Sequence, residues 1–90
     1  MSVPAADEVM QEIQRICDAE LQLARPIAPD LELARDLGLD SLGAMILAVG
    51  LEDRYRVRLD EQDAAALMTV ADLVALVRRR CAESDDAAGR

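Results

Sequence analysis

The residues best placed to do chemistry in this chain are a serine and the aspartate before it, Ser41 and Asp40. They follow Gly38, which allows a sharp turn, and precede an apolar stretch with helical spacing. This order predicts a hydroxyl at a helix start, where free backbone N–H groups and the positive end of the helix dipole stabilise a phosphate. A phosphodiester on Ser41 would be well placed there, and Asp40 could help a transferase to position its metal and cofactor phosphates.

The rest of the chain offers little for catalysis. It has no histidine, and its two cysteines, Cys17 and Cys81, form no C-x-x-C motif. No nucleophile has an adjacent base and no metal-ligand cluster stands out, so the sequence predicts a protein that is not an enzyme and binds no metal. A hydrolase that uses carboxylates alone is the remaining enzymatic alternative, although no carboxylate pair stands out. Cys17 is expected to be a buried small hydrophobe.

The composition bounds the size and the surroundings of the protein. Ninety residues allow one small domain, and a single aromatic residue implies an aliphatic core, which favours packed helices. The 18 acids outnumber the ten bases, all arginine, and give a net charge of −8. This charge opposes binding to nucleic acid or anionic membrane and favours partners with basic docking patches. No signal peptide or membrane-spanning stretch is evident, so a cytoplasmic monomer is expected.

The hydrophobic pattern predicts the elements that must position Ser41. In chain order they are a helix over residues 5–22, a long connection over 24–40 pinned to the core by its leucines, a helix from Ser41 to Arg54 with Asp40 as its N-cap, a short helix from Asp60 or Glu61 to Leu67, and a helix beginning at Thr69. Thr69 and Asp72 form a capping-box-like pair. The sequence therefore predicts an all-α fold, a small four-helix bundle with a long first loop and a short third helix, over residues 1–81, with a disordered tail at 82–90.

The helix after Ser41 carries two apolar stripes. The residues of the first stripe are Ala44, Leu47, Ala48, Leu51 and Tyr55. The residues of the second stripe are Leu42, Met45 and Val49, roughly 130° away around the helix. A helix in a small bundle rarely buries two faces, so we expect the second stripe, which runs toward Glu52 and Asp53, to be an exposed docking surface. The alternative is that the long connection folds over it and makes all these residues core.

Residues 36–55 (DLGLDSLGAMILAVGLEDRY) resemble the acyl carrier proteins, and the resemblance extends over about residues 5–80. It implies that a phosphopantetheinyl transferase moves 4′-phosphopantetheine from coenzyme A to Ser41, and that the terminal thiol then holds acyl groups as thioesters for separate loading and processing enzymes. It also implies that Leu47, Leu51 and Tyr55 are core positions beside a cavity that shelters acyl chains. The partner-docking residues that it implies are Leu42, Met45, Ile46, Val49, Glu52 and Asp53.

Two features depart from the common fatty-acid carriers. Gly43 and Ile46 stand where those carriers place acids, and Arg54 adds a positive charge near the helix end. The docking face is thus more apolar and less acidic than usual. We hypothesise that the protein docks less by charge and serves fatty-acid-like or specialised biosynthesis, such as that of polyketides or lipopeptides.

Two other functions compete with an acyl carrier. A peptidyl or aminoacyl carrier would share the fold and the modified serine, but such carriers more often have G-G-x-S before the apolar residue, and Asp40 favours acyl cargo. A helical interaction domain without a prosthetic group would bind its partners equally well after the substitution Ser41→Ala.

Overall fold

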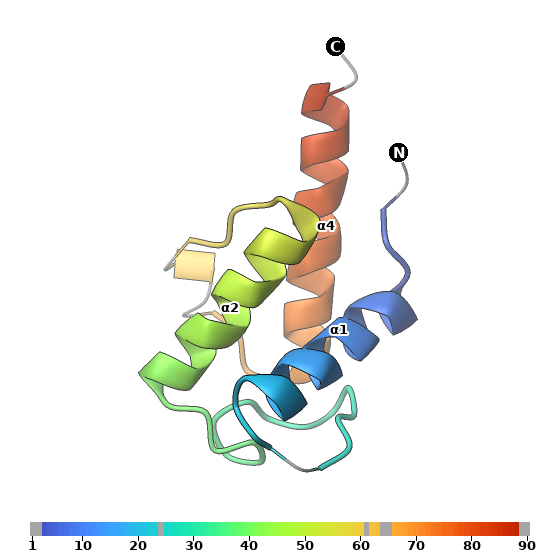
Figure 1. The fold of residues 1–90 in the computed structure, drawn as a ribbon. Helices are drawn as coiled ribbons and strands as arrows, with labels where there is room; N and C mark the ends of the chain where they lie inside the picture. The colour runs from blue at the N-terminus through green and yellow to red at the C-terminus, as the bar shows by residue number, and fades with distance from the viewer. Residues whose placement is uncertain (1–2, 24, 61, 64–65, 89–90) are drawn as a thin grey trace.

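The computed structural model describes residues 3–23, 25–60, 62–63 and 66–88, with side chains described as far as Glu83. Within these ranges the regular elements are the helices α1 (Ala6–Ala19), α2 (Ser41–Tyr55) and α4 (Val70–Ala88). Figure 1 shows α1 lying across the lower part of α4, with α2 packed beside α1. The part described contains no strand, only an isolated bridge between Glu32 and Thr69, so the predicted all-α fold is confirmed.

The first helix is shorter than the predicted range of residues 5–22. It ends at Ala19, and the backbone N–H groups of Glu20 and Leu21 both donate to the carbonyl oxygen of Ile16, at 2.8 and 3.3 Å. Gln22 then adopts a left-handed φ of 54°, which turns the chain away from the helix axis. The prediction failed here because the apolar period continues through Leu21, two residues beyond the end of the helix at Ala19. The second helix, by contrast, extends only one residue beyond its predicted end.

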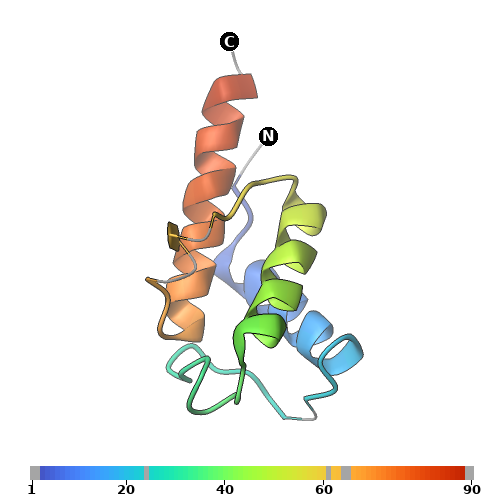
Figure 2. The same ribbon diagram turned by 90° about the vertical axis from the view of Figure 1, so that its left-hand side faces the viewer.

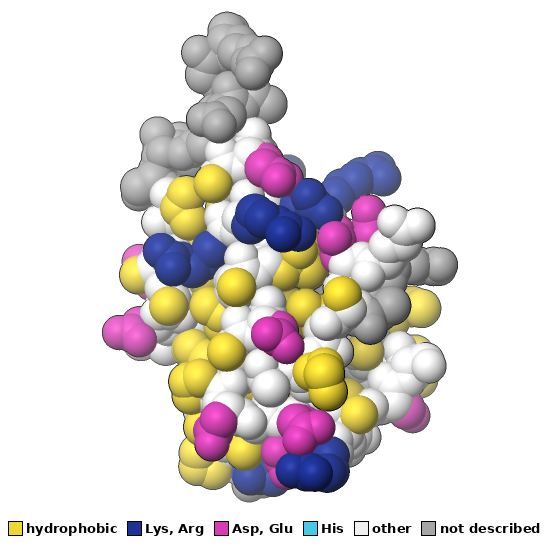
Figure 3. Space-filling model, turned by 180° about the vertical axis from the view of Figure 1, so that it is seen from behind, with side chains coloured by type: hydrophobic (Ala, Val, Ile, Leu, Met, Phe, Trp, Pro, Cys, Tyr) yellow, Lys and Arg dark blue, Asp and Glu magenta, His cyan; other side chains and the backbone are white. Residues whose placement is uncertain are grey.

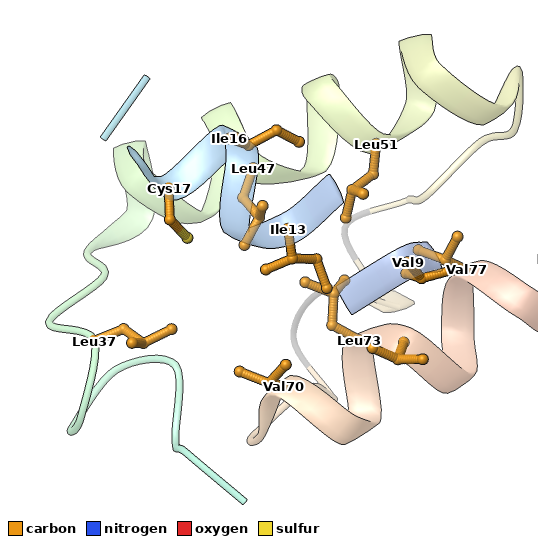
Figure 4. Close-up of a cluster of buried hydrophobic side chains, with 11 residues drawn as sticks. Val9, Ile13, Ile16, Cys17, Leu37, Leu47, Leu51, Val70, Leu73 and Val77 are labelled. Atoms are coloured by element: carbon orange, nitrogen blue, oxygen red, sulfur yellow. The ribbon is translucent and has the colours of Figure 1, made fainter. Parts of the chain in front are cut away.

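The core lies where the three helices meet. Its buried members include Val9, Ile13, Ile16 and Cys17 of α1, Leu47 and Leu51 of α2, and Val70, Leu73 and Val77 of α4. In Figure 4, Leu47 and Leu51 point from α2 toward Ile13. Cys17 is fully buried as predicted, burial raises the pKa of its thiol, and neither cysteine forms a disulfide.

A close approach and an ion-pair cluster join α1 to α2. A Cβ atom on Gly50 would lie only 2.8 Å from Cδ1 of Ile16, so the two helices touch at this glycine. Nearby, the largely buried carboxylate of Glu12 pairs with Arg15, at 2.5 Å, and with Arg54 of α2, at 3.7 Å. Because both arginines reach the same carboxylate, the charge of Glu12 is compensated inside the interface.

The long connection between α1 and α2 is fastened at several points. The side chain of Gln14 donates to the carbonyl oxygen of Arg25 at 2.9 Å and accepts from the N–H of Ile27 at 2.7 Å. Leu37 is buried and other leucines of the segment are half-buried against the core, as predicted. Figure 2 shows this connection passing beneath the helices before α2 begins. The connection therefore covers the lower end of the bundle as seen in this view.

The same connection also bonds to the start of α4. The N–H of Leu33 donates to the carbonyl oxygen of Met68, and the N–H of Val70 donates to that of Leu31, both at 2.9 Å. The predicted capping box is present: the N–H of Thr69 donates to Asp72 Oδ2 at 3.0 Å, and the N–H of Asp72 donates to Thr69 Oγ1 at 3.2 Å. The helix itself begins one residue later than predicted, at Val70.

The remaining predicted segments are the short third helix and the C-terminal tail. Gln62 and Asp63 are helical, but residues 61, 64 and 65 of the predicted third helix lie outside the described residues. At the other end the structure differs from the prediction, because α4 continues to Ala88 instead of giving way to irregular chain at residue 82. A hydrogen bond of 2.7 Å between Arg80 and Glu83 supports the helix across that boundary. No described helix is long and apolar enough to cross a membrane.

Candidate functional site

Ser41 is the first residue of α2 and its side chain is exposed. Asp40 precedes it in an extended conformation, and its Oδ1 accepts a hydrogen bond of 2.8 Å from the N–H of Gly43. Asp40 is therefore the N-cap, as predicted. In the described part of the chain the Ser41 hydroxyl makes no hydrogen bond, so the local structure does not need it.

Gly38 makes the turn into this helix. Its φ of +66° is in the left-handed region, where a side chain would be strained, and a Cβ atom there would have no other atom within 4 Å. The N–H of Leu39 then donates to the carbonyl oxygen of Leu33 at 3.0 Å. The turn is thus fixed by the backbone while the space beside it remains open, which leaves room for a group attached at the helix tip.

The helix tip suits a phosphate-linked group on Ser41. Gly43 donates its N–H to Asp40, so the N–H groups of Ser41 and Leu42 are the ones left for a phosphate at the N-terminus of α2. Oδ2 of Asp40 accepts no hydrogen bond from the described residues. Among these residues no cluster of potential ligands could hold a metal ion.

A cavity of about 270 Å³ lies beside this site, between α2, the long connection and the start of α4. Leu39, Ala44, Leu47 and Ala48 contribute the wall nearest the start of α2. The remaining lining residues are Glu32, Leu33, Ala34, Leu59, Leu67, Met68, Leu73 and Leu76. The lining is therefore apolar apart from Glu32, and it can shelter an aliphatic chain.

The sequence identified only part of this cavity. Leu47 lines it, whereas Leu51 is buried in the core and Tyr55 is half-buried near α1, with its hydroxyl 3.5 Å from the carbonyl oxygen of Glu8. Leu59 and Met68 belong to the wall but had no signal in the helical pattern, because they lie in irregular chain. The only sign of them was the presence of apolar residues outside the predicted helices.

The second apolar stripe of α2 is exposed. Leu42, Met45 and Val49 have 64, 60 and 47% of their surface accessible, and Ile46 is half-buried. The alternative in which the long connection covers them is wrong, because they are exposed and the connection instead shares a cavity with Ala44, Leu47 and Ala48 of α2. Figure 3 shows the molecule from behind, where acids and arginines are scattered among apolar groups. The exposure of Leu42, Met45 and Val49 makes the stripe an apolar surface near Ser41.

The two acids at the end of this stripe have different surroundings. The Oε2 atom of Glu52 accepts a hydrogen bond of 2.7 Å from the N–H of Leu59, and the side chain is half-buried. Asp53 is exposed and lines a shallow hollow between α1 and α2, together with Met45 and Val49. The structure thus places the predicted docking residues on one helix but separates Glu52 from the others by its contact.

Comparisons with known proteins agree with this geometry. The family described as the phosphopantetheine attachment site matches residues 7–77. The chain is 35% identical over 81 residues to the meromycolate extension acyl carrier protein of Mycobacterium tuberculosis, covering 90% of this chain and 65% of that protein. It is 34% identical over 83 residues to the acyl carrier protein of Rhodococcus erythropolis, covering 90% of each chain. The chain therefore spans about two thirds of the length of the first relative and nearly all of the second.

Solved structures show the same fold. The crystal structure of an acyl carrier protein from Thermotoga maritima superposes with a TM-score of 0.78 at 19% identity, covering 87% of this chain and 92% of that one. The solution structure of the acetyl actinorhodin acyl carrier protein from Streptomyces coelicolor has a TM-score of 0.69 at 26% identity, covering 91% of this chain and 95% of that one.

Proposed function

This chain belongs to the acyl carrier proteins, non-catalytic carriers that bear 4′-phosphopantetheine, and on that premise we propose that Ser41 is its attachment site. The observation that carries the proposal is the position of this hydroxyl, exposed and without a hydrogen-bond partner among the described residues, at the first residue of α2. The N–H groups of Ser41 and Leu42 would hold the phosphate. Asp40 would fix the first turn through Gly43 and offer Oδ2 to a transferase-bound metal.

When bound, the arm supplies a thiol that holds acyl groups as thioesters. The protein's own part is to present that thiol at the tip of α2 and to give the acyl chain an apolar refuge in the neighbouring cavity. Leu42, Met45, Ile46 and Val49 would contact the partner enzymes, which are a phosphopantetheinyl transferase and the enzymes that load and process the acyl group. Burial of such an apolar stripe is a sufficient driving force for transient docking.

The residues on the docking face favour partner enzymes of a dedicated pathway over enzymes that recognise a carrier by charge alone. In the first two turns of α2, Gly43 and Ile46 stand where the common fatty-acid carriers place acids, and Arg54 is well exposed. The relatives named above for meromycolate extension and for actinorhodin are carriers of particular acyl products by their names. We infer that this chain serves fatty-acid-like or specialised biosynthesis, through enzymes whose docking patches are apolar or basic.

Intact mass spectrometry tests the attachment site. The protein is incubated with coenzyme A, magnesium and a promiscuous phosphopantetheinyl transferase, and we expect one phosphopantetheine adduct. Ser41→Ala should give none, whereas Ser84→Ala, which removes another serine, should load like wild type. Circular dichroism checks that each variant is helical. A folded wild-type protein that takes up no adduct, or a Ser41→Ala variant that still does, would contradict the proposal.

A further inference from the structure

Two neighbouring acids at the end of α2, Glu52 and Asp53, carry the same charge but have different contacts. Successive residues point about 100° apart around a helix, so the two side chains leave in different directions. The Glu52 carboxylate turns toward the chain that follows α2 and accepts from the N–H of Leu59 at 2.7 Å. Asp53 is exposed and, within the described residues, its side chain makes neither an ion pair nor a hydrogen bond.

Glu52 also holds the end of α2 through its backbone. Its carbonyl oxygen accepts from the N–H of Arg56, the residue that caps the helix, and from the N–H of Val57 at 3.3 Å. Arg56 lies in the left-handed region at φ 57° and ψ 46°, a conformation that a residue with a side chain adopts at some cost. Glu52 therefore accepts hydrogen bonds from three backbone N–H groups within residues 56–59, the four residues that follow α2.

The last of these anchored residues is part of the cavity. Leu59, like Leu47, lines the apolar cavity, and it is half-buried, yet it lies in chain without regular structure. No helical ladder fixes the backbone there, so the bond to a charged carboxylate is the local contact that sets its position. Two residues before Leu59, the buried side chain of Val57 also holds this segment.

We propose that Glu52 is a positioning residue that fixes Leu59 in the wall of the acyl cavity, and that the adjacent Asp53 has no part in holding this wall. The proposal rests on the function proposed above, because the wall matters to function only if an acyl chain enters the cavity. It separates two adjacent carboxylates that the sequence placed together on the docking surface.

Amide exchange in the unmodified protein tests the first half of the proposal. In ¹⁵N-labelled protein followed by NMR, Glu52→Ala should speed exchange of the Leu59 N–H by at least about tenfold, since hydrogen bonds to charged groups contribute about 1.5–3 kcal/mol. Glu52→Asp keeps the charge but is one methylene shorter, and it should behave like Glu52→Ala. Glu52→Gln keeps an acceptor at the same reach and should restore most of the protection.

Asp53→Ala is the matched control, because it removes the same charge one residue away. It should leave Leu59 exchange within about twofold of wild type, the change expected for a surface substitution. If Glu52→Ala and Asp53→Ala change the exchange of Leu59 equally, or if Glu52→Gln exchanges as fast as Glu52→Ala, the positioning role is overturned.

Loading with an eight-carbon saturated acyl group tests the link to the cavity. In wild type and in Asp53→Ala the acyl chain should shift the methyl resonances of Leu59, and in Glu52→Asp this shift should be lost. A wild-type protein that loads but shows no shift at Leu59, or a Glu52→Asp variant that loads and keeps the shift, would overturn the inference. Failure of the folded wild type to load would instead contradict Ser41 as the attachment site, and the exchange data would still decide the role of Glu52.

Discussion

The starts of α2 and α4 are both capped by an acid, but they differ in their burial and in their contacts with the long connection. Ser41 and Val70 are each the first residue of a helix, and an acid supports the first turn in both cases. Ser41 is exposed, and one side-chain hydrogen bond, from Gly43 to Asp40, caps its helix. Val70 is fully buried, and both its own N–H and that of Ala71 donate to carbonyl groups of the long connection.

This contrast shows that two helix starts, each supported by an acid, can differ in how far the rest of the chain uses their free N–H groups. At α4 the reciprocal bonds of Thr69 and Asp72 and the contacts with Leu31 and Pro29 use up the free N–H groups of the first turn. At α2 the N–H groups of Ser41 and Leu42 have no acceptor among the residues that the structure describes. The two helix starts therefore differ in the contacts that the described chain makes with their first turns, more than in the presence of a capping acid.

The largest expected difference between the two helix starts is in the free energy of unfolding. Val70→Ala removes two buried methyl groups from the core and should destabilise the protein by about 2 kcal/mol. Ser41→Ala, at the equivalent position of α2, should change stability by less than about 0.5 kcal/mol. Urea unfolding followed by circular dichroism measures both. Equal losses would mean that the start of α2 is as firmly packed as that of α4.

A smaller effect is expected from the cap of α2. Asp40→Ala removes the acceptor of the Gly43 N–H and should destabilise the helix start by about 1 kcal/mol. Amide exchange of Gly43 should accelerate accordingly, while Asp40→Asn, which keeps an acceptor, should stay near wild type. Unchanged exchange at Gly43 in Asp40→Ala would show that this end of α2 is held by something other than its N-cap.

The smallest effect concerns the dependence of stability on pH. The N–H groups of Thr69 and Met68 donate to Asp72 and lower the pKa of its carboxyl. The unfolded chain therefore binds a proton before the folded one does, so this stabilisation is complete at neutral pH and is lost as the pH falls below about 4. Asp63, whose pKa is lowered by its hydrogen bond with Arg80, acts in the same direction.

Thermal unfolding between pH 7 and pH 2.5 measures this dependence. Wild type should lose stability toward the acid end, and Asp72→Asn should show a shallower loss because one titrating group is gone. A curve for Asp72→Asn that falls as steeply as that of wild type would contradict the role assigned to this cap. It would also weaken the contrast between the closed start of α4 and the open start of α2.

Local signals in the sequence predicted the features that local chemistry decides. The N-cap at Asp40 and the capping box at Thr69 and Asp72 depend on residues three apart, and both were confirmed. The exposure of Leu42, Met45 and Val49 could be inferred because a helix in a small bundle rarely buries two faces. The burial of Leu37 followed from the need to cover apolar side chains in a long connection.

Features that depend on distant packing were not predictable in the same way. The helix α1 ends at Ala19 and the backbone turns at Gln22, although the hydrophobic period continues through Leu21. The cavity wall at Leu59 and the contact of Glu52 with it arise in irregular chain, where no period exists to be recognised. Glu52 and Asp53 look alike in sequence, and only the path of the chain after α2 separates them.

The contact between Gly50 and Ile16 has a consequence for how this sequence can diverge. The two helices approach so closely that a methyl group at position 50 would fall 2.8 Å from Cδ1 of Ile16, and Ile16 is itself buried. A lineage that acquires a side chain at position 50 must therefore turn the end of the Ile16 side chain aside, give up volume at position 16 or move α1 away from α2. Moving α1 would also separate Glu12 from Arg54, so a change at position 50 would then reach this ion pair as well.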